Sequence, residues 1–255
     1  MTEDNNRGNR SVRVALDVLE ALSQLQPIGL SELTRQVRLP KSTVQRALAT
    51  LADAGWIESD SAGRWVVGTR AFIVGSTVGE RGGLRQAALP HMNALAADVG
   101  ETIHLMVLDG EQVVLIERID SRHALRAFSP LGSQAPLHAS SNGKAFLASL
   151  PAEDVERYLS HSLSPTTSRS ITKPDTLRKE LERVRARGYA VSDEELMDGV
   201  VSVAAAIHPP GPRPAASLSI SAPASRMPAR LRTAYGEKVR ATADAIAASL
   251  PRVGL

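Results

Sequence analysis

The sequence predicts an α+β protein made of a small N-terminal module, a linker helix and a larger C-terminal domain with a mostly antiparallel sheet. Three observations lead to this prediction. The 255 residues are enough for two ordinary domains, and 43% of them are hydrophobic, as in chains that bury a core. Residues 8–68 hold three helix patterns followed by a hairpin pattern. Residues 86–255 alternate β-rich runs with helical patterns, and residues 69–85 join the two parts.

The composition excludes several classes of site. The absence of cysteine excludes disulfides, thiolate metal ligands and cysteine nucleophiles, and it favours a reducing compartment. The first residues lack the apolar core of a signal peptide, and no later run reaches the roughly 18 apolar residues of a membrane span. We therefore expect a cytoplasmic protein that has no membrane partner. The net charge of +3 says little about partners, because codon bias also produces an excess of Arg over Lys.

Three helices are predicted in the N-terminal module. The first covers residues 11–25, and its apolar side is formed by Val12, Ala15, Val18, Leu19, Leu22 and Leu25. Ser31 offers an N-cap for a short helix over residues 31–37. The third helix covers residues 40–54, and its buried stripe is formed by Val44, Ala47, Leu48 and Leu51. The last two helices are therefore short and separated by a tight turn.

The exposed side of the third helix carries side chains that hydrogen-bond phosphates and base edges, which is typical of a helix that enters the major groove of DNA. These residues are Lys41, Ser42, Thr43, Gln45 and Arg46. Gln45 is a candidate reader of an A·T base pair, because Gln pairs with adenine. The solvated face of an ordinary amphipathic helix is the alternative. The hairpin pattern that follows at residues 56–68, with Arg64 at its tip, favours a winged helix-turn-helix.

Residues 69–85 are predicted to form a helix that ends in a joint at the Gly82–Gly83 pair. Its apolar residues Phe72, Ile73 and Val78 either pack on their own domain or contact a second chain. The dimer contact is favoured, because one helix-turn-helix reads one half-site and two half-sites need two-fold pairing.

In the larger domain, helices are predicted at residues 84–100, 143–150, 151–160, 173–188 and 229–250. Strands are predicted at residues 101–110, 111–120, 200–208 and 215–224. The Asp109–Gly110 turn makes the first two strands a hairpin. Hairpins with helices between them predict a sheet that carries helices on one side and a pocket on the other.

No catalytic residue, metal site or cofactor is predicted. The six histidines are scattered without metal-ligand spacing, and His104 lies in an alternating strand as a packed or pocket-lining residue. No serine lies in a G-x-S-x-G turn, and no Gly-rich loop suited to a phosphate is present in the sequence.

Two sets of small polar residues are candidates for a pocket. A helix that starts near Gly143 is preceded by Ser140, Ser141 and Asn142. Free backbone N–H groups and the helix dipole favour an anion there, and a plain helix cap is the alternative. Ser219 and Ser221 share one face of a predicted strand, where they either face solvent or bond to a ligand.

The chain resembles the IclR-type transcriptional regulators along most of its length. The DNA-binding module of that family is similar to GLSELTRQVRLPKSTVQRALATLADAGWIE followed by GRWVVG. Motifs of the family's C-terminal domain are similar to HASSNGKAFLA, DEELMDGVVSVAAAI and SLSISAP. The family often has a basic residue where Val14 stands, so its neighbour Arg13 is the candidate phosphate contact of the first helix. The family commonly has an aromatic residue or His where Gln45 stands, which implies a different base preference.

The resemblance implies a GAF-like effector domain, with double-stranded operator DNA, a small-molecule effector and a homodimer or dimer of dimers as partners. It implies that the effector pocket is lined by Ala135, Ser141, Asn142, Ser192, Ser202, Ser219 and Ser221. Some relatives have an acid and a Cys where Ser192 and Ser202 stand, so their effectors do not transfer to this chain. Hydroxyl groups suit a small carboxylate or oxygen-rich metabolite, because they donate and accept hydrogen bonds without demanding a charge.

The leading hypothesis is an allosteric repressor of a catabolic or metabolic operon that a small molecule releases or modulates. An activator of the same family is the nearest alternative. Two alternatives come from other classes: an enzyme on a GAF-like fold, for which no acid–base pair is seen in the sequence, and a DNA-binding protein without a ligand.

Overall fold

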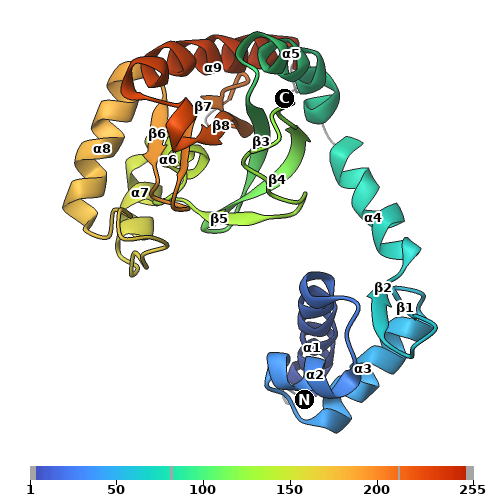
Figure 1. The fold of residues 1–255 in the computed structure, drawn as a ribbon. Helices are drawn as coiled ribbons and strands as arrows, with labels where there is room; N and C mark the ends of the chain where they lie inside the picture. Colours follow the sequence, from blue (N-terminus) through green and yellow to red (C-terminus); the bar gives the residue numbers. More distant parts are fainter. Residues whose placement is uncertain (1–3, 81–82, 212, 251–255) are drawn as a thin grey trace. The chain divides into compact units, whose positions relative to one another are not determined.

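The computed structural model describes residues 4–80, 83–211 and 213–250 (Figure 1). It divides the chain into two units, with the boundary between Gly79 and Glu80. Gly82 of the predicted joint and residues 251–255 of the predicted C-terminal domain lie outside the described residues. The α+β prediction is confirmed, because a helical module with a small hairpin precedes a domain built on an antiparallel sheet.

The first unit contains the elements predicted for a winged helix-turn-helix. They are α1 (Asp4–Leu25), α2 (Leu30–Val37), α3 (Lys41–Asp53), β1 (Ile57–Ser59) and β2 (Trp65–Val67), and α4 (Thr69–Glu80) follows them within the range predicted for the linker helix. Two details differ from the predictions. Helix α1 begins before residue 11, and the N-cap of α2 is Gly29, so Ser31 lies inside the helix and does not cap it.

The core of this unit lies where α1, α2 and α3 meet. Its buried residues include Val18 and Leu22 of α1 and the complete predicted stripe of α3, which is Val44, Ala47, Leu48 and Leu51. Val12 and Leu25 were expected on the buried side of α1, but they are 61% and 40% exposed. The fully buried residues of α1 are Val18 and Leu22, which face α2 and α3, so the covered stripe is narrower than predicted.

The turn between α2 and α3 and the wing are both fixed by backbone geometry. Arg38 closes α2 with a left-handed backbone (φ 54°), which turns the chain sharply before α3. Strands β1 and β2 are antiparallel, and Ile28 extends them as an isolated bridge to Trp65. The backbone N–H of Val67 donates to the Gln26 side chain at 2.7 Å, which ties the wing to the helices.

The second unit is built on a six-stranded antiparallel sheet with the order β5-β4-β3-β8-β7-β6. Its strands are β3 (Thr102–Asp109), β4 (Gln112–Ile119), β5 (Gln134–Pro136), β6 (Ala190–Asp193), β7 (Val200–Ile207) and β8 (Ala216–Pro223). Its helices are α5 (Leu84–Val99), α6 (Ser141–Ser149), α7 (Ala152–Leu159), α8 (Pro174–Arg187), a short 3-10 turn (Ala224–Arg226) and α9 (Ala229–Ser249). The edge strands β5 and β6 were not predicted, and α6 begins at Ser141 instead of near Gly143.

The two faces of this sheet differ in chemistry. Apolar side chains of β3, β7 and β8 pack against α5 and α9, which lie together over one face (Figure 1). The alternate residues of the same strands point to the other face, where α6 lies. Strand β8 is buried along its whole length, because it lies between β3 and β7 with helices on both sides. The polar face of the sheet is therefore inside the domain.

Among the helices of the described part of the chain, none combines the length and the apolar character that a membrane span needs.

Candidate functional sites

The first candidate site is the exposed side of α3. Lys41, Ser42, Gln45 and Arg46 are exposed and Thr43 is half-buried, because the opposite side of the helix forms the core. Lys41 and Arg46 have no ion-pair partner among the described residues, so both cations are available to phosphates or bases. The structure thus brings all five predicted α3 residues to one end and side of a helix that follows a tight turn.

Arg13 and Arg64, the other two predicted DNA contacts, come from different elements of the same unit. Arg13 is exposed on α1. Arg64 lies at the wing, where its guanidinium contacts Asp60 at 2.8 Å and stays about half exposed. Asp60 also accepts hydrogen bonds from the backbone N–H groups of Ala62 and Arg64, at 2.9 and 2.8 Å. These hydrogen bonds, the Arg64 backbone bond first, lower the pKa of Asp60 below its usual value. Arg64 is therefore held in place by a charged partner.

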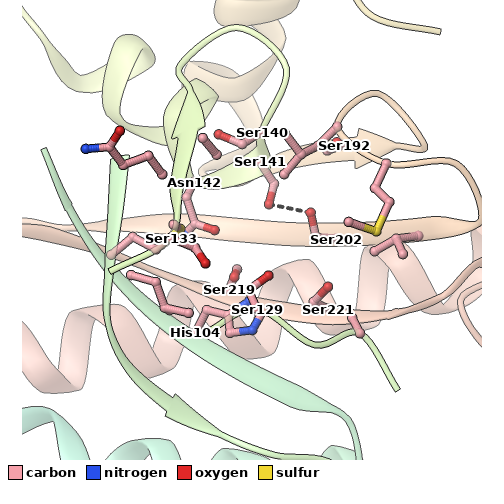
Figure 2. Close-up of a pocket in the computed structure, with 18 of the residues that line it drawn as sticks. His104, Ser129, Ser133, Ser140, Ser141, Asn142, Ser192, Ser202, Ser219 and Ser221 are labelled. Atoms are coloured by element: carbon pink, nitrogen blue, oxygen red, sulfur yellow. Dashed lines mark hydrogen bonds between the residues drawn. The ribbon is translucent and has the colours of Figure 1, made fainter. Parts of the chain in front are cut away.

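The second candidate site is a cavity between the polar face of the sheet and the start of α6 (Figure 2). Its volume for water-sized molecules is about 90 Å³, several times the roughly 10–15 Å³ that one water needs. All seven residues predicted to line an effector pocket line this cavity: Ala135, Ser141, Asn142, Ser192, Ser202, Ser219 and Ser221. They come from β5, α6, β6, β7 and β8, which are far apart in the sequence.

Several of these polar groups are bonded to each other or to the backbone. The hydroxyls of Ser141 and Ser202 lie 2.7 Å apart, and the Ser192 hydroxyl donates to the carbonyl of Ala139 at 2.9 Å. The amide of Asn142 donates to the hydroxyl of Ser217 at 3.0 Å. These bonds fix the upper wall of the cavity, and the serines of β8 form the floor opposite (Figure 2).

Two buried polar atoms at the floor have no partner among the described residues. They are Nε2 of His104 and the hydroxyl oxygen of Ser219. The two residues are direct neighbours across β3 and β8. Burial, with a smaller contribution from the charge of Arg118, lowers the pKa of His104 from 6.5 to about 4. The imidazole is therefore neutral at pH 7.

The start of α6 is placed against the cavity by short-range contacts. The hydroxyl of Ser140 accepts the backbone N–H of Gly143 at 3.0 Å and so caps the helix. A Cβ atom at Gly143 would overlap the backbone of Leu137, so only glycine allows this close approach. The start of α6 therefore has a fixed position, and its residues Ser141 and Asn142 line the cavity, where a helix start favours an anion.

Two loops complete the cavity. Phe128 comes from the segment after β4, and the guanidinium of Arg118 in β4 lies 4.3 Å from its ring centre, which holds this aromatic side chain at the cavity wall. On the other side, Leu196 and Met197 come from the loop between β6 and β7. These apolar residues were not identified from the sequence, because only the loop conformation brings them to the cavity.

His104 is the functional candidate that the sequence identified least sharply. Its place in an alternating strand predicted a packed or pocket-lining residue, and the structure places it in the cavity lining. The register of β3 on β8, which pairs His104 with Ser219, was the missing information. No group of His, Asp or Glu suited to a metal ion is found among the described residues.

A winged helix-turn-helix with an exposed basic helix, joined in one chain to a sheet domain with a polar internal cavity, defines a ligand-responsive DNA-binding protein. Comparison with protein families supports this class. Residues 11–61 match the model described as "IclR helix-turn-helix domain", and residues 77–248 match "Bacterial transcriptional regulator IclR C-terminal". The chain belongs to the IclR family of bacterial transcriptional regulators.

Similar proteins span nearly the whole chain. The "HTH-type transcriptional regulator BhcR" of Paracoccus denitrificans is 37% identical over 88% of this chain and 81% of its own length. The "Transcriptional repressor IclR" of Escherichia coli is 34% identical over 90% of this chain and 86% of its own length. Among solved structures, an IclR homologue of Microbacterium hydrocarbonoxydans complexed with 4-hydroxybenzoate superposes with a TM-score of 0.80 at 28% identity, covering 94% of this chain and 98% of that one.

Proposed function

We propose that this protein is a repressor of a catabolic or metabolic operon and that a small carboxylate or oxygen-rich molecule modulates its binding to an operator. The observation that carries the proposal is the cavity, which gathers polar side chains from distant parts of the sequence and leaves two buried polar atoms unpaired. The name of the Escherichia coli relative supports repression over activation. As a DNA-binding regulator, the protein acts in the cytoplasm.

The DNA contacts proposed are Arg13, Lys41, Ser42, Thr43, Gln45, Arg46 and Arg64. Residues 8–68 form the DNA-binding domain, residues 69–85 the linker and residues 86–255 the effector domain. Within the first of these, Arg46 and Gln45 are the candidates for base contacts, because both are exposed on the outer side of α3. Lys41, Arg13 and Arg64 supply phosphate contacts.

The effector contacts proposed are Ala135, Ser141, Asn142, Ser192, Ser202, Ser219 and Ser221. The cavity lining contains no Lys, Arg, Asp or Glu. The start of α6 supplies free N–H groups and the positive end of the helix dipole, so a carboxylate is favoured there without a cationic side chain. Coupling of about 1–3 kcal/mol between effector and operator is enough for a useful switch.

A homodimer is part of the proposal, with a dimer of dimers as the larger assembly. One helix-turn-helix reads one half-site, and a two-fold operator needs two copies. Exposed apolar side chains in the first unit support pairing there, because Phe72 and Ile73 of α4 are 75% and 60% exposed.

The test is selection of operator sequences from random duplex DNA with the full-length protein, followed by binding measurements on the selected site. Arg46→Ala should weaken binding to that site by about 1–3 kcal/mol, or roughly fivefold to 150-fold. Arg183→Ala is the matched control, because Arg183 is an exposed arginine of the other unit. Failure to enrich any sequence would contradict the regulator proposal. The double variant Ser219→Ala, Ser221→Ala should bind the operator normally and lose its response to the effector.

A further inference from the structure

We infer that Arg38, in the turn between α2 and α3, is a further DNA contact and that its guanidinium binds a backbone phosphate of the operator. The inference rests on the proposed DNA-binding face of α3 and extends this face to the turn that precedes the helix. Arg38 differs from the other exposed arginines of the described residues in its backbone conformation, which is left-handed.

The first observation is that Arg38 has a conformation that side chains disfavour. Its φ of 54° and ψ of 35° bring the Cβ atom close to the following carbonyl oxygen. Among the described residues, the other non-glycine residue with a positive φ is Glu194. The carboxylate of Glu194 accepts the backbone N–H of Gly199 at 2.8 Å and lies 2.9 Å from the guanidinium of Arg169. The side chain of Arg38 makes no such contact within the described part of the chain.

The second observation is that the chain has glycine at the two comparable positions. Helices α5 and α8 also end in a left-handed cap, and these caps are Gly100 and Gly188. In all three helices the backbone N–H of the cap donates to the carbonyl four residues earlier. Glycine is the usual residue at such a cap, because it has no Cβ atom. An arginine that is retained in a disfavoured conformation indicates a functional role for its side chain.

The neighbours of Arg38 explain why the turn has this shape. Leu39 packs on the core of the first unit, and Pro40 is the N-cap of α3. Because α2 ends at Val37, the chain has to change direction at Arg38 for Leu39 to reach the core. The fold therefore requires the left-handed conformation at this position, and it does not require an arginine there.

The position of Arg38 suits a phosphate contact. It lies three residues before Lys41, so the two Cα atoms are at most about 11 Å apart. Both side chains are exposed, and neither has an ion-pair partner among the described residues. Arg35 in the last turn of α2 is another exposed cation, whereas Glu32 is the only acidic residue in the sequence from 31 to 50. A guanidinium in this basic surface can bind a phosphate with two parallel hydrogen bonds.

A role within α2 is the alternative. A cation at the C-terminal end of a helix interacts favourably with the helix dipole, and it would stabilise the protein in the absence of DNA. The two roles predict opposite changes in stability when Arg38 is replaced by glycine. A phosphate contact predicts a gain in the free protein and a loss in DNA binding, whereas a role within α2 predicts a loss in the free protein alone.

The first arm of the test measures urea unfolding of the full-length protein. Arg38→Gly removes the side chain and the backbone strain, so the midpoint of unfolding should rise above that of the wild type. Arg38→Ala is the matched variant, because it removes the charge and keeps a Cβ atom in the left-handed conformation. Its midpoint should lie below that of Arg38→Gly. If Arg38→Gly is less stable than the wild type, Arg38 serves α2 and the inference is overturned.

The second arm measures binding to the selected operator and to duplex DNA of scrambled sequence at several salt concentrations. Arg38→Gly and Arg38→Ala should weaken binding to both duplexes, because a phosphate contact does not depend on sequence. The loss of affinity should shrink about 3.5-fold when the salt concentration rises from about 50 to about 200 mM, as expected for one contact. Arg38→Lys keeps the charge, so it should keep the salt dependence of the wild type. Arg183→Ala removes an exposed arginine of the other unit, and it should leave the salt dependence unchanged.

The outcomes separate the inference from the proposed function. If Lys41→Ala and Arg46→Ala weaken operator binding and Arg38→Gly does not, Arg38 makes no phosphate contact, and the proposed face of α3 stands without it. If Arg38→Lys changes the salt dependence as much as Arg38→Gly does, the charge is not what binds, and the inference is also overturned. If none of these variants weakens binding, the proposed face is wrong and the inference fails with it.

Discussion

The ammonium of Lys144 is completely buried and donates hydrogen bonds to both carboxylate oxygens of Glu195, at 2.6 and 2.7 Å. Lys144 belongs to α6, whose first turn lies at the cavity, and Glu195 precedes the cavity residues Leu196 and Met197. The pair therefore joins the helix on one wall of the cavity to the loop on another. Burial lowers the pKa of Lys144 and raises that of Glu195, and the charge of each partner opposes these shifts.

Removing one member of this pair should destabilise the second unit strongly. Lys144→Met leaves the Glu195 carboxylate buried without its cation, and such changes cost about 3–5 kcal/mol. Urea unfolding of the variant measures this loss. The double variant Lys144→Met, Glu195→Leu should recover a large part of it, because no buried charge remains. A loss below about 1 kcal/mol in the single variant, the range of a surface ion pair, would show that the pair is solvated in solution.

The glycine of α6 should tolerate no side chain. In Gly143→Ala the new methyl group overlaps the Leu137 backbone, so the helix start must move, at a cost of about 1–3 kcal/mol. Gly75→Ala in α4 is the control, since nothing lies within 4 Å of its added Cβ. That variant should be as stable as the wild type or more so, because alanine favours helix. Thermal unfolding of both variants makes the comparison, and equal midpoints would contradict the close packing.

Acid should destabilise the wild-type protein partly through His104. Its pKa is about 4 in the folded protein and near 6.5 when unfolded, so the unfolded state binds more protons between these values. The stability that the neutral histidine provides is present above pH 6.5 and is lost as the pH falls through 4. The loss between pH 7 and pH 4 is roughly 3 kcal/mol. His104→Phe lacks this contribution, so the stability difference between variant and wild type should grow by that amount on acidification. A difference that stays constant with pH would place His104 in a solvated site.

Two residues of α3 should affect DNA binding differently. Lys41→Ala removes a phosphate contact, so it should weaken binding to all sequences alike. The slope of the logarithm of the binding constant against the logarithm of the salt concentration should fall in magnitude by about one. Gln45→Ala should leave the salt dependence unchanged and relax the preference at one A·T position by about 1–3 kcal/mol. Fluorescence anisotropy with the selected operator and single-base variants at several salt concentrations separates these effects. Identical behaviour of the two variants would contradict the assigned roles.

The exposed apolar face of α4 should control dimer formation. Phe72→Asp places a charge where we expect a second chain, so we expect the variant to sediment as a monomer and the wild type, at the same concentration, to sediment as a dimer. Its operator affinity should fall with it, since half-sites are then bound singly. Leu125→Asp is the control, because Leu125 is similarly exposed in the other unit. If Phe72→Asp stays dimeric, pairing uses another surface.

Much of the fold follows from local patterns. The stripe of α3, the Gly188 C-cap of α8 and the hairpin of β3 and β4 each appear as a periodicity or a turn signal within a few residues, and all of them are present in the structure. Strands β5 and β6 have three and four residues and gave no such signal. They are strands because longer neighbours offer them hydrogen bonds, which depends on tertiary contacts.

For the candidate sites too, some features follow from local sequence patterns and others depend on tertiary contacts. The sequence by itself determined the two-part α+β organisation, the basic face of α3 and, with the family resemblance, the residues to examine for an effector pocket, because each depends on local spacing or a matched motif. Only the tertiary structure decided that Ser219 is unpaired beside His104, that Gly143 touches Leu137 and that Lys144 meets Glu195. For His104 with Ser219 and Lys144 with Glu195, the physical reason is that partners 51 and more residues apart are selected by strand register and helix packing, and no local pattern encodes which partner a buried polar group will find or lack. For Gly143 and Leu137, which are near in sequence, the close approach depends on how the loop before α6 packs on the helix.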